Sequence, residues 1–179
     1  RVGNQNMRFK ICLAALAATV AFASPGYAQV ASATAEARGL VLQPLTLTRV
    51  DDLDFGTVVA SAVAGTVAIN ADTGARTVAG GVTGVPTAPG NRALFAGAGT
   101  AGQLVDLTLT PPAGNVLVSG ANSLTVSSMA LDAGGGLTQT RTIDGTGAFQ
   151  VGVGGDFAIA AGQPNGLYAA NFDLTANYQ

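Results

Sequence analysis

The chain contains very few of the side chains that carry chemistry at neutral pH. Its 179 residues include no histidine and no tryptophan, and its one cysteine and one lysine both lie near the start, at Cys12 and Lys10. Serine and cysteine nucleophiles therefore lack their usual base, and a disulfide within the chain is excluded. We expect a protein that is not an enzyme, binds no cofactor and is stabilised by its hydrophobic core.

Charge is also scarce, and it is mostly of one sign. Charged residues make up 10% of the chain, and beyond residue 28 five arginines face ten acidic residues. No cluster of basic residues occurs there. Binding to nucleic acid or to an anionic membrane surface relies on such clusters. The composition therefore predicts a protein that binds no nucleic acid.

The acidic residues offer only weak candidates for a site. Paired carboxylates support glycoside hydrolysis, but these acids fall mainly in turns or on polar faces of strands. The one cluster is Asp51-Asp52-Leu53-Asp54. Asp52 and Asp54 would share a strand face and reach one calcium ion, although a solvated strand face is the preferred interpretation, and no metal site is predicted.

The first 28 residues are typical of an export signal. A basic segment, Met7-Arg8-Phe9-Lys10, precedes an apolar run at residues 11–23, and Ser24-Pro25-Gly26 and Ala28 follow. This order predicts a secretory signal peptide cleaved after Ala28, with residues 1–6 as over-read sequence. Because 13 apolar residues are too few to span a bilayer, which needs about 20, we expect no membrane span in the mature chain. The alternative is a buried helix.

From residue 40 onward, apolar and polar residues alternate with the period of β-strands. Such segments include 45–48, 53–55, 67–69, 105–110, 124–131, 149–153 and 157–159. Glycine- and proline-rich turns separate them, and residues 80–91 form the one long loop. Pro44 marks a strand edge or a crossing between sheets, Ser127-Ser128 a β-bulge, and Gly154-Gly155 a turn. About eight short strands at this spacing predict an antiparallel β-sandwich or barrel over residues 43–179.

The clearest alternation occurs at the end of the chain. Apolar residues occupy every second position from Tyr168 to Tyr178, with polar residues between most of them. This pattern predicts one long half-buried strand. Its apolar face includes Phe172 and Leu174.

Residues 29–42 form an N-terminal extension of different character. Alanine occupies every second position, at Ala31, Ala33, Ala35 and Ala37, and the larger Leu40 and Leu42 follow. Such a segment can extend as a strand but offers little side chain to pack within its own domain. It is either a frayed terminus or a strand that pairs with another molecule.

One motif invites a cofactor interpretation that its context does not support. Gly97-Ala98-Gly99-Thr100-Ala101-Gly102 matches the glycine pattern of dinucleotide-binding loops. That mechanism needs the loop to open a helix, whereas residues 103–110 have the pattern of a strand. We therefore expect a hairpin loop here.

Several short motifs, taken in order, resemble one family. They are Leu53-Asp54-Phe55-Gly56-Thr57, Gly65-Thr66-Val67, Val151-Gly152 with Gly154-Gly155, and Gly166-Leu167-Tyr168 with Phe172 and Tyr178. Together with the leader they resemble a bacterial secreted domain-of-unknown-function family with an L-x-F-G start and a G-x-Y…Y end. That family resembles fimbrial subunits of the chaperone–usher and spore-coat-U-like kind.

The resemblance implies an immunoglobulin-like sandwich that lacks one strand and is completed by a neighbour's N-terminal extension. It would assign residues 31–42 as the donor strand, through Ala31, Ala33, Ala35, Ala37, Leu40 and Leu42. It would assign Tyr168, Phe172, Leu174 and Tyr178 to the acceptor groove. It implies a homopolymer exported through the periplasm to the cell surface, with a periplasmic chaperone and an outer-membrane usher as partners. Two features depart from the family pattern: the donor residues 31–37 are small, and no disulfide is present.

Two functions follow as hypotheses. The first is a structural subunit of an extracellular fibre or pilus that polymerises head-to-tail by donor-strand exchange, with roles in adhesion or surface coating. The second is a monomeric exported binding module for a surface glycan or matrix component, with residues 80–91 as its contact surface. Residues 29–42 folded into their own sandwich would favour the second hypothesis.

Overall fold

A computed structural model describes residues 31–179, and the predicted signal peptide lies outside the described residues. Leu40–Gln179 form a compact unit, and residues 31–39, which carry no helix or strand, are described by themselves. Within the part of the chain that the structure describes, no helix is long and apolar enough to cross a membrane.

The compact unit consists of ten β-strands and one turn of 3₁₀ helix, η1 (Ala113–Asn115). The strands are β1 (Thr46–Asp51), β2 (Val58–Ile69), β3 (Arg76–Gly84), β4 (Ala93–Ala98), β5 (Leu104–Thr110), β6 (Val116–Ser119), β7 (Asn122–Leu131), β8 (Thr138–Thr142), β9 (Ala148–Ile159) and β10 (Asp173–Tyr178). The predicted all-β class is therefore confirmed, with ten strands where about eight were expected.

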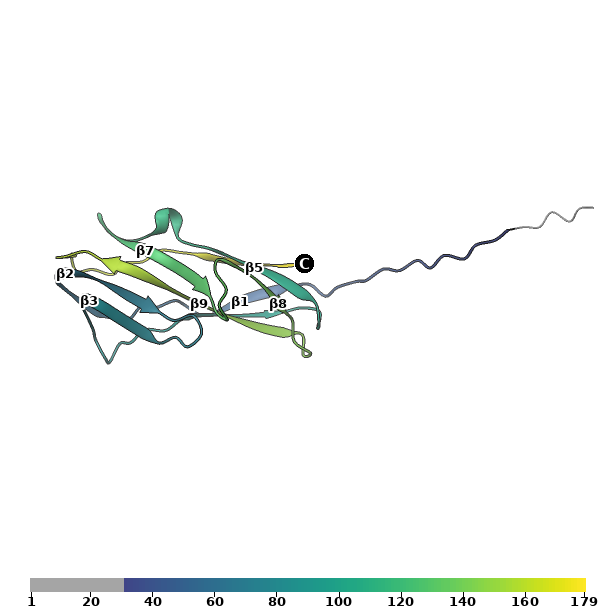
Figure 1. Ribbon diagram of the computed structural model, residues 1–179, viewed down its shortest axis with the longest axis horizontal. Helices are drawn as coiled ribbons and strands as arrows, with labels where there is room; N and C mark the ends of the chain where they lie inside the picture. Colours follow the sequence, from purple (N-terminus) through teal and green to yellow (C-terminus); the bar gives the residue numbers. More distant parts are fainter. Residues whose placement is uncertain (1–30) are drawn as a thin grey trace, which may run out of the picture. The chain divides into compact units, whose positions relative to one another are not determined.

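The strands form two antiparallel sheets (Figure 1). The larger sheet has seven strands in the order β1-β4-β9-β2-β3, and the β6–β7 hairpin joins it where β7 pairs with β9. The smaller sheet has three strands in the order β10-β5-β8. Apolar side chains from both sheets, such as Val151 of β9 and Leu107 of β5, share the main core, so the two sheets form a sandwich.

Strand β9 organises the larger sheet. Its first half pairs with β4, and its second half pairs with β2 and β7. The turn predicted at Gly154-Gly155 is wrong, because both glycines lie within this continuous strand. A Cβ atom at Gly154 would lie 2.3 Å from the carbonyl oxygen of Ile69, so the glycine serves close strand packing instead of a turn.

Apolar side chains form two clusters. The main core contains residues from β4, β5, β7 and β9, and Val105, Val151 and Val153 in it are completely inaccessible. A smaller cluster around Val67 and Phe157 lies under the β2–β3 hairpin. Leu117 of β6 packs against both clusters. Residues of both clusters line the cavity of the candidate site, which is described below.

The predicted long C-terminal strand is shorter than expected. Strand β10 begins at Asp173, which is opposite Thr110, the last residue of β5. Pro111 and Pro112 follow Thr110, and prolines cannot donate to a ladder. Tyr168 and the residues up to Phe172 consequently lack a strand partner along β5 and form an irregular segment.

Two loop predictions also need correction. The G-x-G-x-x-G run was expected to be a hairpin loop, but β4 and β5 belong to different sheets, so residues 99–103 cross from one sheet to the other. Residues 80–91 were expected to be one loop, but Gly80–Gly84 belong to β3 and pair with β2. The true loop is therefore confined to residues 85–92.

Other local predictions are confirmed. The register of β7 against β9 shifts between Val126 and Ser128, which is the bulge predicted at Ser127-Ser128. Pro44 precedes β1, an edge strand of the larger sheet. The bulge follows because the apolar residues change from one face of the strand to the other at that point. The edge position follows because proline has no N–H to donate to a neighbouring strand.

Candidate assembly groove

The sandwich is open along one side, between strands β1 and β10. Within the described residues, β1 pairs only with β4 and β10 pairs only with β5, so each strand ends its sheet. Apolar residues from both sides pack against the main core but remain partly exposed; they are Leu45, Leu47, Leu174, Ala176 and Tyr178. A further strand at this position would cover them.

The two edges meet at Gly99. A Cβ atom at Gly99 would lie 2.4 Å from the Tyr178 hydroxyl and 3.0 Å from Cδ1 of Leu45. Deeper in the molecule, the rings of Phe95 and Phe172 lie edge to face at 6.2 Å. The glycine therefore permits the close approach of the two edges at this end.

Next to the end of β1 and the start of β10 lies an apolar cavity of about 890 Å³. Side chains of β7 and β9 line it, among them Met129 and Phe157. Its walls are two irregular segments, residues 52–57 before β2 and residues 163–172 before β10. We call the open side and this cavity together the groove.

The L-x-F-G motif builds the first wall. Asp54 forms an antiparallel bridge with Asn91, through N–H···O bonds of 2.9 and 2.7 Å, and its carboxylate accepts the Gly56 N–H at 2.7 Å. These contacts fix the chain so that Phe55 points inward, where its ring packs edge to face on Phe157 at 4.6 Å. Leu53 packs against the main core. The motif therefore directs the side chains of Leu53 and Phe55 toward the groove.

Arg76 holds this wall in place. Its guanidinium donates to the carbonyl oxygens of Ala88 at 2.8 Å, Val85 at 2.9 Å and Thr57 at 3.0 Å. Gly56 lies directly against it, because a Cβ there would be 2.6 Å from Nη1 of Arg76. Sequence analysis missed this role. The signal available was a lone arginine at the start of a strand, with no acid spaced to pair with it.

The second wall is fixed by a tyrosine. The Tyr168 hydroxyl donates to the carbonyl of Pro164 at 2.7 Å and accepts from the amide of Gln163 at 2.9 Å. Gln163 also donates to the carbonyl of Ser123 at 3.1 Å. The loop is thereby tied to β7, and its outer residue Leu167 remains 86% exposed.

The predicted acceptor residues divide into two groups. Tyr168 and Phe172 line the cavity. Leu174 and Tyr178 lie on β10, at the narrow end of the groove. The Tyr178 hydroxyl accepts the N–H of Thr100 at 2.7 Å and donates to the carbonyl of Gln43 at 2.8 Å.

The predicted donor residues lie in and just after the N-terminal segment. Ala31, Ala33, Ala35 and Ala37 are exposed and lie outside any strand. Leu40 is 73% exposed, and Leu42 is half-buried beside Gln43. Their role as a donor strand stays a prediction.

Several of the acidic residues have structural partners. Asp52 pairs with Arg49 at 2.7 Å, while Asp54 holds the turn at Gly56. The pKa of Asp144 lies below its usual value because the Thr146 hydroxyl and then the backbone N–H groups of Ala148 and Thr146 donate to it. Among the described residues, no three His, Cys, Asp or Glu side chains gather in a way that would hold a metal ion.

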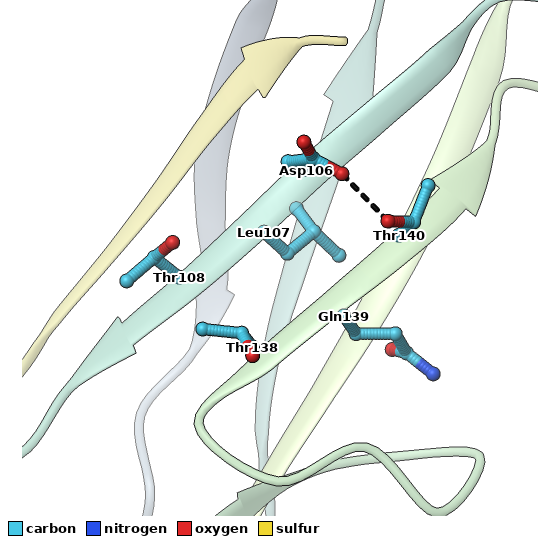
Figure 2. Close-up of a pocket in the computed structure, with 6 residues that line it drawn as sticks. All are labelled: Asp106, Leu107, Thr108, Thr138, Gln139 and Thr140. Carbon is cyan, nitrogen blue, oxygen red and sulfur yellow. Dashed lines mark hydrogen bonds between the residues drawn. The ribbon is translucent and has the colours of Figure 1, made fainter.

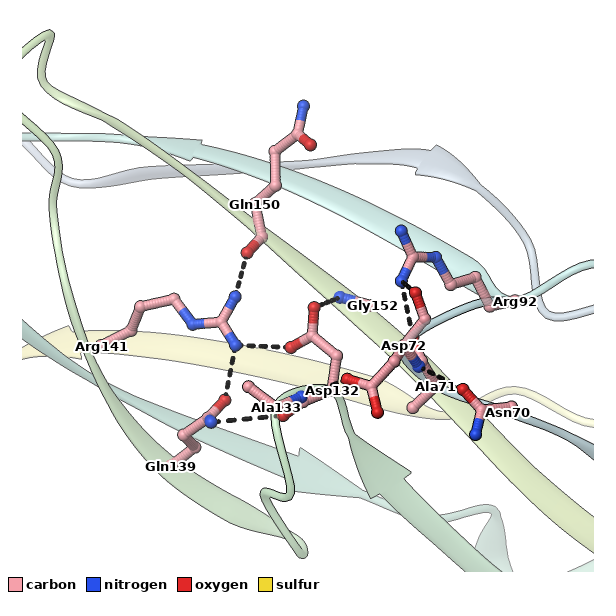
Figure 3. Close-up of polar contacts among 10 residues, drawn as sticks. All are labelled: Asn70, Ala71, Asp72, Arg92, Asp132, Ala133, Gln139, Arg141, Gln150 and Gly152. Atoms are coloured by element: carbon pink, nitrogen blue, oxygen red, sulfur yellow. Dashed lines mark hydrogen bonds and ion pairs between the residues drawn. The ribbon is translucent and has the colours of Figure 1, made fainter. Parts of the chain in front are cut away.

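A polar network ties the two sheets together away from the groove (Figure 3). Arg141 of β8 pairs with Asp132, which follows β7, and also donates to the carbonyl of Gln150 on β9. Asp132 in turn accepts the N–H of Gly152 at 2.9 Å. Both charged side chains are largely buried, at 21% and 17% exposure. The network is satisfied internally, so we assign it a structural role.

The outer face of the smaller sheet is flat and polar. Figure 2 shows Asp106, Thr108, Thr138 and Thr140 projecting from β5 and β8, with Asp106 accepting from the Thr140 hydroxyl at 2.6 Å. Only a shallow depression lies between them.

The fold and the groove define an antiparallel β-sandwich protein with one open edge and an apolar groove beside it. The chain belongs to the family described as "Domain of unknown function (DUF4402)", whose model matches residues 45–178. No curated protein and no solved structure matches the chain. The domain-of-unknown-function part of the resemblance is confirmed, and the fimbrial part stays a prediction.

Proposed function

We propose that this protein is a structural subunit of an extracellular fibre or pilus that polymerises head-to-tail by donor-strand exchange. The observation that carries the proposal is the open side of the sandwich between β1 and β10, where core residues from both sheets remain partly exposed. A strand supplied by a neighbouring subunit would close this side. The fibre would act in adhesion or surface coating.

The edge of β10 provides the main-chain part of the interaction. It is six residues long and pairs with β5 on one side only among the described residues. In an antiparallel ladder, alternate residues direct their N–H and C=O groups to each side, so β10 presents unpaired groups toward the groove. Strand addition to such an edge derives affinity from main-chain hydrogen bonds and specificity from side-chain pockets.

Residues 31–42 are the proposed donor strand. Small side chains at Ala31, Ala33, Ala35 and Ala37 suit the narrow part of the groove, where the two edges meet at Gly99. Leu40 suits the wide cavity, and burying its side chain contributes about 2 kcal/mol. Affinity would then depend mostly on the backbone ladder, because alanines bury little area.

An open edge also explains the proposed partners. An unpaired strand beside an exposed apolar groove is prone to wrong pairing before assembly. A periplasmic chaperone would cover the edge of β10, and an outer-membrane usher would direct the exchange. Export through the periplasm to the cell surface is part of the same proposal.

A peptide-binding experiment tests the proposal. A variant lacking residues 29–42 is heated with and without a synthetic peptide of residues 31–42. Binding at hundred-fold excess over Kd stabilises the folded state by about 2.7 kcal/mol, so we expect the melting temperature to rise by several degrees. A matched peptide with aspartate at the positions of Leu40 and Leu42 should produce a clearly smaller rise.

The contradicting result is an unchanged melting temperature with the native peptide, or an equal rise with both peptides. Either would favour the monomeric binding module for a surface glycan or matrix component.

A further inference from the structure

The link between the donor strand and its own domain is very short. The backbone N–H of Gln43 donates to Oγ1 of Thr100 at 2.7 Å, and its carbonyl accepts from the Tyr178 hydroxyl at 2.8 Å. Gln43 is therefore fixed to its own sandwich, whereas Leu40 and Val41 are 73% and 93% exposed. Three residue steps separate Leu40 from Gln43, and they span at most about 10 Å.

The inference rests on the proposed donor-strand exchange. Under that proposal, the short distance between Leu40 and Gln43 constrains where two subunits meet. Leu40 fits only the wide end of the groove, because the narrow end is closed down around Gly99. When Leu40 of one subunit occupies the cavity of the next, its own Gln43 must lie within about 10 Å of that cavity. The surfaces around the cavity mouth and around Gln43 are then brought into contact.

Part of the surface around the cavity mouth is apolar and uncharged, whereas Asp52 and Asp54 lie on another part of it. We call the apolar part the groove rim; it consists of five exposed apolar residues among those that line the cavity, Val59, Pro164, Leu167, Ala169 and Ala170. Leu167 is 86% exposed and Val59 is 57% exposed. No charged residue occurs between Asp156 and Asp173. Depletion of charge around exposed apolar side chains is typical of the core of a protein interface.

The surface around Gln43 has small, uncharged side chains, which suits contact with the apolar groove rim. Its nearest neighbour is the turn at residues 100–102, where Thr100 receives the Gln43 N–H. Ala101 and Gly102 are exposed, and no charged residue occurs between Arg92 and Asp106. Small uncharged residues allow a close approach of another backbone. This turn belongs to the glycine-rich run at residues 97–102, which is followed by strand β5 and not by a helix.

We infer that the groove rim of one subunit docks on the turn at residues 100–102 of the subunit that donates its strand. The contact is heterologous and repeats head to tail, as required for an open fibre. It joins consecutive subunits directly, without a flexible linker between them. The partner is a second copy of this chain.

A cysteine pair tests this contact, because residues 29–179 contain no cysteine. Residues 29–179 carrying both Leu167→Cys and Ala101→Cys are assembled, oxidised or treated with a short bismaleimide, and run on a denaturing gel without reductant. We expect a ladder of covalent multimers from the double variant. Each single variant should stop at dimers. A control pair, Val63→Cys with Ala101→Cys, should give no ladder, because Val63 is 62% exposed but lies outside the cavity lining.

Electron microscopy of the same samples separates this inference from the proposed function. Filaments without a ladder, or an equal ladder from the control pair, would overturn the rim contact while leaving donor-strand exchange standing. Absence of filaments from the unsubstituted chain would overturn both. As a second variant, Leu167→Asp should reduce filament number at least several-fold while leaving the β-sheet circular dichroism spectrum unchanged, and undiminished filaments would count against the contact.

Discussion

Single residues explain why the family motifs have the form they do. In L-x-F-G, Asp54 closes a turn onto Gly56, and Phe55 reaches Phe157. Gly56 has a φ of 71° and lies where no side chain fits, since a Cβ would be 2.2 Å from the carbonyl oxygen of Ala88. The motif thus shapes the groove wall.

Replacing this glycine should destabilise the domain more than replacing another glycine of similar conformation. Gly56→Ala combines left-handed backbone strain with a steric clash, so we expect a loss of about 3 kcal/mol or more in the free energy of unfolding. Gly102→Ala is the matched control: its φ is 77°, but no atom lies within 4 Å of the added Cβ. Backbone strain alone costs about 1 kcal/mol there. Urea unfolding measures both, and equal losses would contradict the assignment of the clash.

At the scale of elements, alternation predicted the strands well and their partners poorly. The segments at 105–110 and 124–131 became β5 and β7, bulge included. The hairpin expected between β4 and β5 failed because consecutive strands of a sandwich often belong to opposite sheets. Such crossings depend on long-range packing, which a period-two pattern does not contain.

The candidate site shows the same difference between what local sequence patterns predict and what long-range packing decides. Tyr168 and Phe172, which the family resemblance assigned to an acceptor groove, line the cavity, and their role in binding a donor strand stays a prediction. The wall formed by residues 52–57 and its anchor Arg76 were missed, because the four carbonyl oxygens that Arg76 reaches lie in two loops that are far apart in the sequence. No local spacing encodes that arrangement.

The stability of the packing between the two sheets should depend on the ion pair between Arg141 and Asp132. Arg141→Met removes the partner of a largely buried carboxylate, and we expect a loss of about 2 kcal/mol in the free energy of unfolding at pH 7. Arg49→Met is the control, since its pair with Asp52 is exposed and should change stability by less than about 0.5 kcal/mol. Chemical denaturation distinguishes them, and a similar small loss for both would mean that the network does not hold the sheets together.

For the whole molecule, the open side of the sandwich is the feature that most needs an explanation. A protein with no disulfide depends on its core for stability, yet apolar residues of both sheets remain partly exposed between β1 and β10. In a fibre, each subunit would complete the core of the next. The monomer described here would then be the less stable form, and assembly would supply the missing burial.

The most direct test of donor-strand exchange is negative-stain electron microscopy of residues 29–179 beside a version that lacks residues 29–42. We predict filaments from the longer chain and single particles from the shorter one, because only the longer chain carries the donor strand. Single particles from both chains, or filaments from both, would contradict the account.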